Sequence, residues 1–375
     1  MGGRTETMDN LVVVKIGSST LTTAEGAIDM AYISRLCAQV AELHDRGYQV
    51  IIVTSGAAAA GRERLGIPSR PSDIETLQAC AAAGQAQLTE VYAACLAERD
   101  LACGQVLLTR RDVVDREGYL NARNTLMRLL ELGAVPVVNE NDTVSVSEFA
   151  FGDNDMLGAI VAALVGASLY VILSDVEGLF TADPTKDPDA RLIGHVTAID
   201  REVAQMAGGS SSSVGTGGMA SKLRAARAML TSGIPMVICH GRRDDVVVDV
   251  VEGKSVGTRF EGDGSVVHGT GRKLWIGLAE VPRGTVTVDA GAVRAVVDQG
   301  ASLLPVGVVS TTGAYREGDV ISVTDGEGTE IARGVARYDA RDMERVAGLK
   351  LDVIARFMPE KASCPCIHRD EMLVF

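Results

Sequence analysis

The chain has 375 residues, of which 46% are hydrophobic, and a formal net charge of −13. This length favours two domains with a sizeable core, and the acidic balance argues against a nucleic-acid partner bound through its phosphates. The polar first ten residues lack the apolar segment of a signal peptide, and the seven cysteines show no disulfide or metal spacing. We therefore expect a protein of the reducing cytoplasm.

Apolar strands alternate with helices over the first 260 residues. The expected strands are 11–14, 50–53, 105–108, 135–138, 169–173 and 236–239. The expected helices are about 29–45, an Ala-rich helix after residues 54–57, and 71–99, 120–132, 156–165, 219–230 and 244–251. Continuous apolar runs are typical of parallel strands buried on both faces. The pattern predicts an α/β fold, a three-layer αβα sandwich with a mostly parallel sheet.

One uncharged stretch, residues 156–174, is nearly long enough to span a membrane. Gly166 and the two small residues after it interrupt the stretch. A helix to about Val165 followed by a buried strand explains it better, so we expect no membrane contact.

The pattern changes after Phe260, where a Gly-rich segment begins. Short strand-like segments separated by glycines and charged turns follow at 286–288, 306–309, 320–323 and 334–336. We expect a catalytic domain over residues 8–260, a linker over 261–279, and a small barrel-like β domain over 280–375, because barrel closure removes exposed sheet edges.

Polar and acidic residues collect around the strand at 135–138. Asn139, Glu140, Asn141 and Asp142 follow that strand directly, and residues 152–155 precede the next helix. In α/β sheets ligands bind at the carboxyl ends of the strands. Asp and Asn also cap helix starts, but capping accounts for only one or two of these residues. The cluster therefore predicts a site.

Two further segments carry a lysine next to small residues. Lys15 ends the first strand and is followed by Gly17 and two serines, while Lys222 lies one turn into a helix opened by a Gly-rich loop. Backbone N–H groups in such loops and at helix starts favour phosphate, and lysine acts there as a point charge. Taken alone, Lys15 could also be a strand-end lysine that reaches solvent.

Two partial matches to nucleotide-binding motifs are excluded by the residues around them. Residues 215–220 fit G-x-G-x-x-A but follow a Ser-rich loop and not a strand, and residues 253–255 resemble the end of a P-loop whose first glycine is replaced by Val248. Two lysine-bearing loops and an acidic cluster instead predict phosphoryl transfer from a nucleotide. The five histidines are scattered, and a carboxylate acceptor would need no base.

The sequence resembles the glutamate 5-kinases of the amino-acid-kinase superfamily. The resemblance is carried in order by the segments VVKIGSS, VTSGA, PVVNEND, FGDNDML, LSDVEGLF and GTGGMASK. It covers nearly the whole chain, and the C-terminal part is similar to the PUA domain of two-domain members. It implies the amino-acid-kinase fold and ATP-dependent phosphorylation of the γ-carboxylate of L-glutamate to L-glutamyl 5-phosphate, the first step of L-proline biosynthesis.

The resemblance also implies roles for individual residues. Lys15 and Lys222 would stabilise the phosphates, and Asp155 would orient both lysines and the metal region. The implied nucleotide contacts are Lys15, Ser174, Asp175, Thr216, Gly217, Gly218, Met219, Ala220, Ser221 and Lys222. The implied glutamate contacts are Ser55, Asp142 and Asn154, with Asp142 at the α-ammonium and Asn154 at a carboxylate. Taken alone, Ser55 also suits a helix cap and Asp175 a turn.

Cofactors and partners follow from the resemblance and not from the residue pattern. They are ATP with Mg²⁺, proline as a feedback inhibitor, a homo-oligomer (dimer or tetramer), and hand-over of the product to glutamyl phosphate reductase; no protein metal ligand is assigned. One alternative is a related kinase acting on N-acetylglutamate or aspartate, although an acylated nitrogen offers Asp142 no charge. The other is an RNA-binding regulator, disfavoured because acidic residues outnumber basic ones in the β domain.

Overall fold

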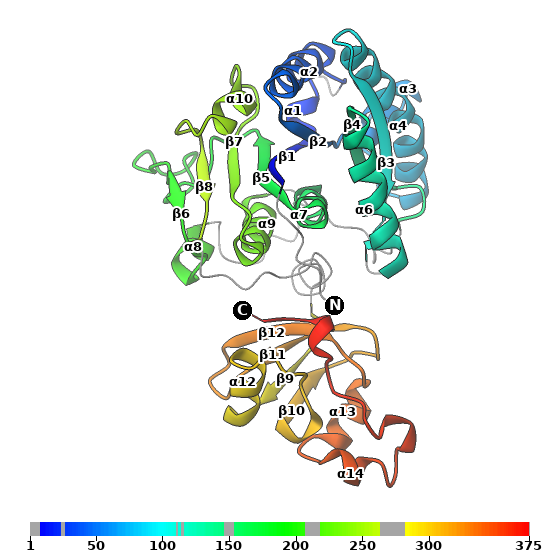
Figure 1. Cartoon of the computed structure of the whole chain (residues 1–375), viewed down its shortest axis with the longest axis vertical. Helices are drawn as coiled ribbons and strands as arrows, with labels where there is room; N and C mark the ends of the chain where they lie inside the picture. The colour runs from blue at the N-terminus through cyan, green and yellow to red at the C-terminus, as the bar shows by residue number, and fades with distance from the viewer. Residues whose placement is uncertain are drawn as a thin grey trace. The chain divides into compact units, whose positions relative to one another are not determined.

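The computed structural model describes residues 8–23, 27–109, 112–113, 116–145, 154–206, 218–262 and 282–374. The chain divides into two compact units, residues 1–268 and 269–375 (Figure 1). No helix in the described ranges is long and apolar enough to cross a membrane.

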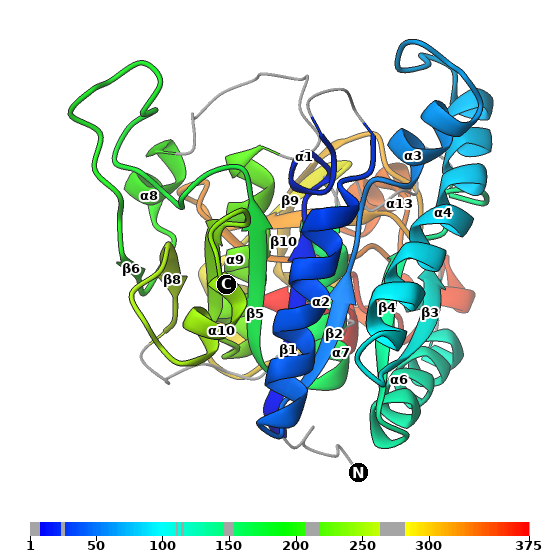
Figure 2. The same ribbon diagram turned by 90° about the horizontal axis from the view of Figure 1, so that it is seen from above.

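The N-terminal unit is built on an eight-stranded sheet with the strand order β3-β4-β2-β1-β5-β7-β8-β6. The strands are β1 (Met8–Ile16), β2 (Gln49–Val53), β3 (Ala102–Leu108), β4 (Ala134–Glu140), β5 (Ala167–Ser174), β6 (His195–Val196), β7 (Met236–His240) and β8 (Thr258–Phe260). The six strands β3, β4, β2, β1, β5 and β7, in their order across the sheet, are parallel, and β8 pairs antiparallel to β7. Figure 2 shows β1 between β2 and β5, at the centre of this order.

Helices cover both faces of the sheet, which confirms the three-layer sandwich. One layer contains α2 (Met30–Asp45), α3 (Ala57–Arg64), α4 (Ile74–Ala97) and α10 (Val246–Val251), and the other contains α6 (Arg116–Glu131), α7 (Asn154–Val165) and α9 (Met219–Ser232) (Figure 1). The short helices are α1 (Ser18–Leu21) and α8 (Arg201–Met206). Val12 and Val14 of β1 pack into the apolar core on the α2 side.

The structure differs from the expected elements mainly at their ends. β4 continues through Asn139 and Glu140, which pair with Leu107 and Leu108 of β3. The polar residues that follow the apolar run are therefore still part of the sheet, because the hydrogen bonds between strands join main-chain N–H and C=O groups. Strands β6 and β8 were not expected, since two or three residues carry no measurable periodicity.

Two glycines allow the backbones of α3 and α4 to touch. A Cβ atom on Gly61 would lie 1.7 Å from the carbonyl oxygen of Cys80, and one on Gly84 would lie 1.9 Å from that of Ala57. Gly56, just before α3, has a φ of +87°, a conformation that other residues rarely adopt. These contacts fix where α3 begins, directly after the end of β2.

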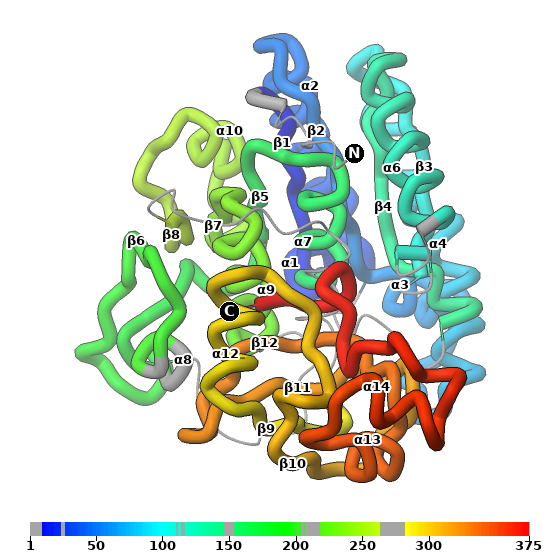
Figure 3. Tube along the Cα trace, turned by 60° about the horizontal axis from the view of Figure 1, so that its bottom comes forward, coloured from blue at the N-terminus to red at the C-terminus, as the bar shows by residue number. Residues whose placement is uncertain are grey.

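The C-terminal unit contains a five-stranded sheet with its own apolar core. Its strand order is β10 (Val308–Gly313), β9 (Gly284–Val288), β11 (Val320–Thr324), β12 (Glu330–Val335) and β13 (Met372–Val374). The helices, which the sequence pattern did not indicate, are α12 (Ala290–Val297), α13 (Ala340–Val346) and α14 (Leu351–Ile354) (Figure 3). Three 3-10 turns are also present, at Pro305–Gly307, Pro359–Lys361 and Arg369–Glu371. A separate core is what an independent domain requires.

Candidate active site

The carboxyl ends of β1, β2, β4 and β5 border a cavity of about 560 Å³. Seven of the expected site residues line it: Lys15, Ser55, Asp142, Asn154, Ser174, Asp175 and Lys222. A second cavity, of about 690 Å³, includes Leu169 and Val237 near the amino ends of β5 and β7. None of the expected residues lines this larger cavity, so the smaller one, at the ligand-binding edge of the sheet, is the candidate site.

Asp155 lies between two lysines from different elements. It is fully buried in the first turn of α7, and its Oδ1 pairs with Nζ of Lys15 at the end of β1. Its Oδ2 lies 3.3 Å from Nζ of Lys222 and accepts a hydrogen bond of 2.9 Å from Oγ of Ser221. The Tyr170 hydroxyl donates to the main-chain carbonyl of Asp155 at 2.7 Å. The sheet and both helices therefore hold this carboxylate in place.

The charge of Asp155 is set by competing effects. Burial acts to raise its pKa, but the charges of Lys15 and Lys222 and the hydrogen bonds from Lys15 and Ser221 prevail and lower the pKa below its ordinary value. The carboxylate is therefore ionised at neutral pH. Two lysines and one aspartate leave a net positive charge at the edge of the cavity, where an anionic phosphate can be held.

Asn154, the first residue of α7, joins three other segments. Its Nδ2 lies 2.5 Å from the carbonyl oxygen of Thr54, 3.1 Å from Oγ of Ser55 and 2.8 Å from Oδ1 of Asn139. The Nδ2 of Asn139 in turn donates to Oε1 of Gln85 in α4 at 2.7 Å. Ser55 and Asn154 are thus brought together as expected.

Asp142 lies in the turn after β4. Burial raises its pKa to about 6, and the nearby charge of Glu140 adds to the effect. Oγ of Ser145 donates to Oε1 of Glu140 at 2.6 Å, which satisfies one oxygen of that second carboxylate. A desolvated carboxyl group of this kind favours a cationic ligand, because the ligand's charge stabilises its ionised form.

The residues expected at the nucleotide lie beyond β5 and at the start of α9. Ser174 is buried at the end of β5, and its Oγ donates to Oδ1 of Asp175 at 3.1 Å. Gly218 precedes α9, which starts with Met219, Ala220, Ser221 and Lys222; of these five residues, only Lys222 lines the cavity. The first N–H groups of a helix have no partner within it and suit phosphate oxygens. Thr216 and Gly217 lie outside the described residues.

Sequence reasoning missed three residues of this region: Gln85, Arg62 and Arg70. Asn139 was visible in the polar stretch after 135–138, but only its contacts show that it positions Asn154. Gln85 and Arg62 lie in Ala-rich helices and carry no local signal. In the parts of the chain that the structure describes, no group of three or more His, Cys, Asp or Glu side chains could hold a metal ion.

Comparisons with known proteins bear on the family and the fold of the chain. The model of the amino acid kinase family matches residues 10–240, and that of the PUA domain matches residues 284–358. Glutamate 5-kinase of Geobacter sp. (strain M21) is 44% identical over 97% of each chain. Glutamate 5-kinase of Myxococcus xanthus (strain DK1622) is 46% identical over 97% of this chain and 96% of its own.

A solved structure shares the fold at lower identity. Carbamate kinase from Giardia lamblia bound to AMP-PNP superposes with a TM-score of 0.51 and 17% identity, covering 69% of this chain and 100% of that one. At this identity the likeness bears on the fold alone.

Proposed function

The chain belongs to the amino acid kinase family, as a glutamate 5-kinase with a C-terminal PUA domain, and from this premise we propose how its site works. The enzyme uses ATP to phosphorylate the γ-carboxylate of L-glutamate, which gives L-glutamyl 5-phosphate in the first step of L-proline biosynthesis. The observation that carries the mechanism is the buried group of Lys15, Asp155 and Lys222 beside the polar cluster of Ser55 and Asn154.

ATP binds on the side of β1 that carries β5 and β7. Ser174 and Asp175 at the end of β5 contact the nucleotide, and the segment from Thr216 to Lys222 surrounds its phosphates. The support is that Ser174, Asp175 and Lys222 line the same cavity. Backbone N–H groups at the start of α9 provide the further donors that phosphate oxygens need.

Glutamate binds on the other side of β1, next to β2 and β4. Asp142 pairs with the α-ammonium group, and Ser55 donates a hydrogen bond from its Oγ to a carboxylate oxygen. Asn154 donates to a carboxylate oxygen by giving up its 3.1 Å contact with Oγ of Ser55. The raised pKa of Asp142 supports this assignment, since a buried carboxyl group gains most from a cationic partner. The contacts of Asn139 and Gln85 keep the Asn154 amide in one orientation.

In the chemical step, an oxygen of the γ-carboxylate attacks the γ-phosphorus of ATP and ADP leaves. The acceptor is already an anion at neutral pH, so no general base is required. Lys15 and Lys222 stabilise the charge on the transferring phosphoryl group, and Asp155 holds both ammonium groups in position.

Mg²⁺ enters this site with ATP. A magnesium ion prefers oxygen ligands and keeps several waters, so nucleotide phosphates and one or two carboxylates would hold it. Asp175, which lines the cavity on the proposed nucleotide side, would be a carboxylate ligand of the ion. When bound, the ion supplies positive charge to the phosphates.

We extend the proposal to the enzyme's setting. All seven cysteines are free, which supports a reducing cytoplasm. The enzyme forms a homo-oligomer, a dimer or tetramer; proline acts as its feedback inhibitor, and the product passes to glutamyl phosphate reductase. These last three properties rest on the family alone.

The experiment that tests the function is ADP release with a panel of acceptors, combined with trapping of the acyl phosphate by hydroxylamine. L-Glutamate should give both ADP and hydroxamate. L-Aspartate and N-acetyl-L-glutamate should give neither at the same concentration. Efficient use of N-acetyl-L-glutamate would reassign Asp142 and the substrate.

A further inference from the structure

Two arginines on the glutamate side of the cavity have no partner in the proposed mechanism. Arg62 in α3 and Arg70 in the segment between α3 and α4 both line the cavity, and Arg62 is half-buried. Within the described ranges, neither guanidinium makes a hydrogen bond or an ion pair. By contrast, Lys15 and Lys222, the other cations of the lining, pair with Asp155.

An unpaired guanidinium that faces a cavity matches an anion. Arginine presents its donors in a planar fork that fits the two oxygens of a carboxylate. L-Glutamate brings two carboxylates, and the γ-carboxylate must lie near Lys15 and Lys222 for phosphoryl transfer. Ser55 and Asn154 offer neutral hydrogen bonds to carboxylate oxygens, but the α-carboxylate still lacks a cationic partner.

The strand order places Arg62 where this partner is needed. α3 follows β2, and Asp142 follows β4, the neighbour of β2. The α-ammonium and the α-carboxylate share one carbon atom, so their partners must lie on the same side of the site. The lysines and the nucleotide residues belong instead to β1, β5 and α9.

Resting on the proposed function, we infer that Arg62, with Arg70 as a second cation, binds the α-carboxylate of L-glutamate and selects acceptors that carry it. The matching acceptor class is an α-amino acid with an ionised α-carboxylate. Arg62 is thus a specificity-determining residue for the acceptor, while ATP binds on the side of the cavity that carries Lys15 and Lys222.

The test compares Arg62→Gln with Arg64→Gln on two acceptors. Arg64 is exposed near the end of the same helix and does not line the cavity, so it is the matched control. The acceptors are L-glutamate and L-isoglutamine, in which a neutral amide replaces the α-carboxylate. Thermal melting of each variant establishes that it is folded.

For Arg62→Gln, the KM for L-glutamate should rise about 10- to 100-fold, the effect of losing a hydrogen bond between charged groups. The KM for ATP should not change, and kcat/KM for L-isoglutamine should change little, so that the preference for L-glutamate falls. Arg64→Gln should match the wild type. The inference is overturned if Arg62→Gln leaves the KM for L-glutamate unaltered, raises the KM for ATP instead, or weakens both acceptors equally. Lack of L-glutamate-dependent ADP release in the wild type would instead refute the proposed function itself.

Discussion

At the scale of residues, a substitution of Asp155 can test the role of its charge without changing its size. Asp155→Asn keeps the size of the side chain but removes the negative charge that holds Lys15 and Lys222. We expect kcat to fall about 100- to 1000-fold, the usual effect of losing one preorganised charge contact. The KM for glutamate should change little. Lys15→Ala and Lys222→Ala should act in the same direction.

The measurement for Asp155→Asn is steady-state ADP release with both substrates varied. Asp183→Asn, at an exposed carboxylate that lines neither large cavity, is the control and should behave as the wild type. A rise in the KM for glutamate without loss of kcat would show that the lysine group binds the acceptor and not the phosphates.

Asp142 should make glutamate binding depend on pH. Its pKa of about 6 means that the carboxylate is ionised at pH 7 and becomes protonated as the pH falls through 6. The protonated form cannot pair with the α-ammonium, so kcat/KM for glutamate should fall over this range. The γ-carboxyl group of glutamate titrates lower, at roughly 4.3.

The check is a pH profile of kcat/KM between pH 5 and 8 for the wild type and Asp142→Asn. The variant should start with a higher KM for glutamate and show a flatter profile, because the titrating group is gone. Parallel profiles for the two proteins would assign the pH dependence to another group.

At the scale of elements, the contact between α3 and α4 controls the acceptor side of the site. Gly84→Ala places a methyl group 1.9 Å from the carbonyl oxygen of Ala57, so the two helices must separate. We expect a loss of stability of about 1–3 kcal/mol or more. The shift of α3 should also raise the KM for glutamate more than that for ATP.

Thermal melting and steady-state kinetics measure both effects. Ala82→Ser adds one atom to the exposed face of α4 and is the matched control, with no expected change. If Gly84→Ala and Ala82→Ser melt at the same temperature, the close approach of the helices is not required.

Several elements of the N-terminal sheet could be predicted from local sequence. β1, β2 and β5 were recognisable because strands buried on both faces keep a continuous apolar run. The helix–strand pair of α7 and β5 likewise followed from the break at Gly166. The lysine loops and Asp155 were predictable because each belongs to a contiguous motif.

Other residues could not be found from local patterns. Gln85 meets Asn139, 54 positions away, only because α4 packs beside the end of β4. Arg62 resembles a solvent-exposed charge until the cavity is known. The C-terminal helices were not predicted, because segments as short as Leu351–Ile354 show no helical period.

At the scale of the whole molecule, the site residues all belong to the N-terminal unit. We propose that the kinase domain spans residues 8–260, the linker 261–279 and the PUA-like domain 280–375. A chain that ends at residue 262 should keep glutamate-dependent ADP release, because the second unit has a separate core. Full-length protein assayed in parallel is the control. A soluble, folded truncation without activity would mean that the second unit completes the enzyme.

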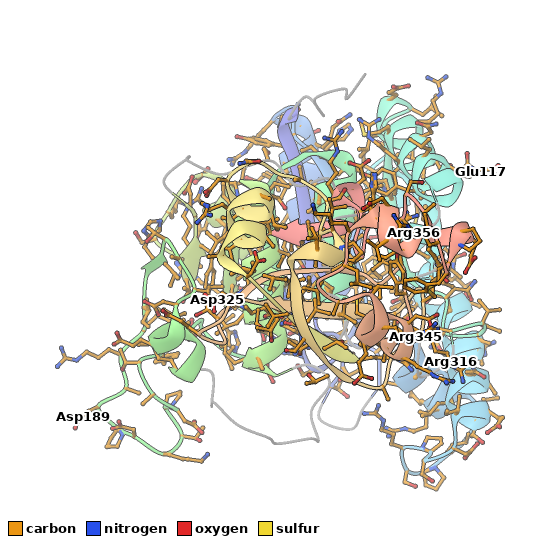
Figure 4. The ribbon with its side chains drawn as sticks, turned by 90° about the horizontal axis from the view of Figure 1, so that it is seen from below. Glu117, Asp189, Arg316, Asp325, Arg345 and Arg356 are labelled. Carbon is orange, nitrogen blue, oxygen red and sulfur yellow. The ribbon has the colours of Figure 1, made fainter. Side chains whose placement is uncertain are left out.

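The C-terminal unit is also expected not to bind RNA. Figure 4 shows Arg316, Arg345 and Arg356 on one side of this unit and Asp325 on the other, but acidic residues outnumber basic ones in it. Non-specific binders reach Kd values of only about 10⁻⁴ to 10⁻⁶ M at physiological salt. A gel shift with tRNA should therefore show no complex. A shift that is lost with the truncated chain would reinstate a regulatory role in RNA binding.

The strand order of the N-terminal sheet also bears on how such an enzyme can evolve. Proposed donor contacts and proposed acceptor contacts lie on opposite sides of β1. Mutations in the loops after β2 and β4 can therefore change which molecule is phosphorylated without disturbing the use of ATP. A library randomised at residues 62–70, which leaves Gly61 in place, and selected on a new acceptor should yield variants whose KM for ATP is inherited unchanged.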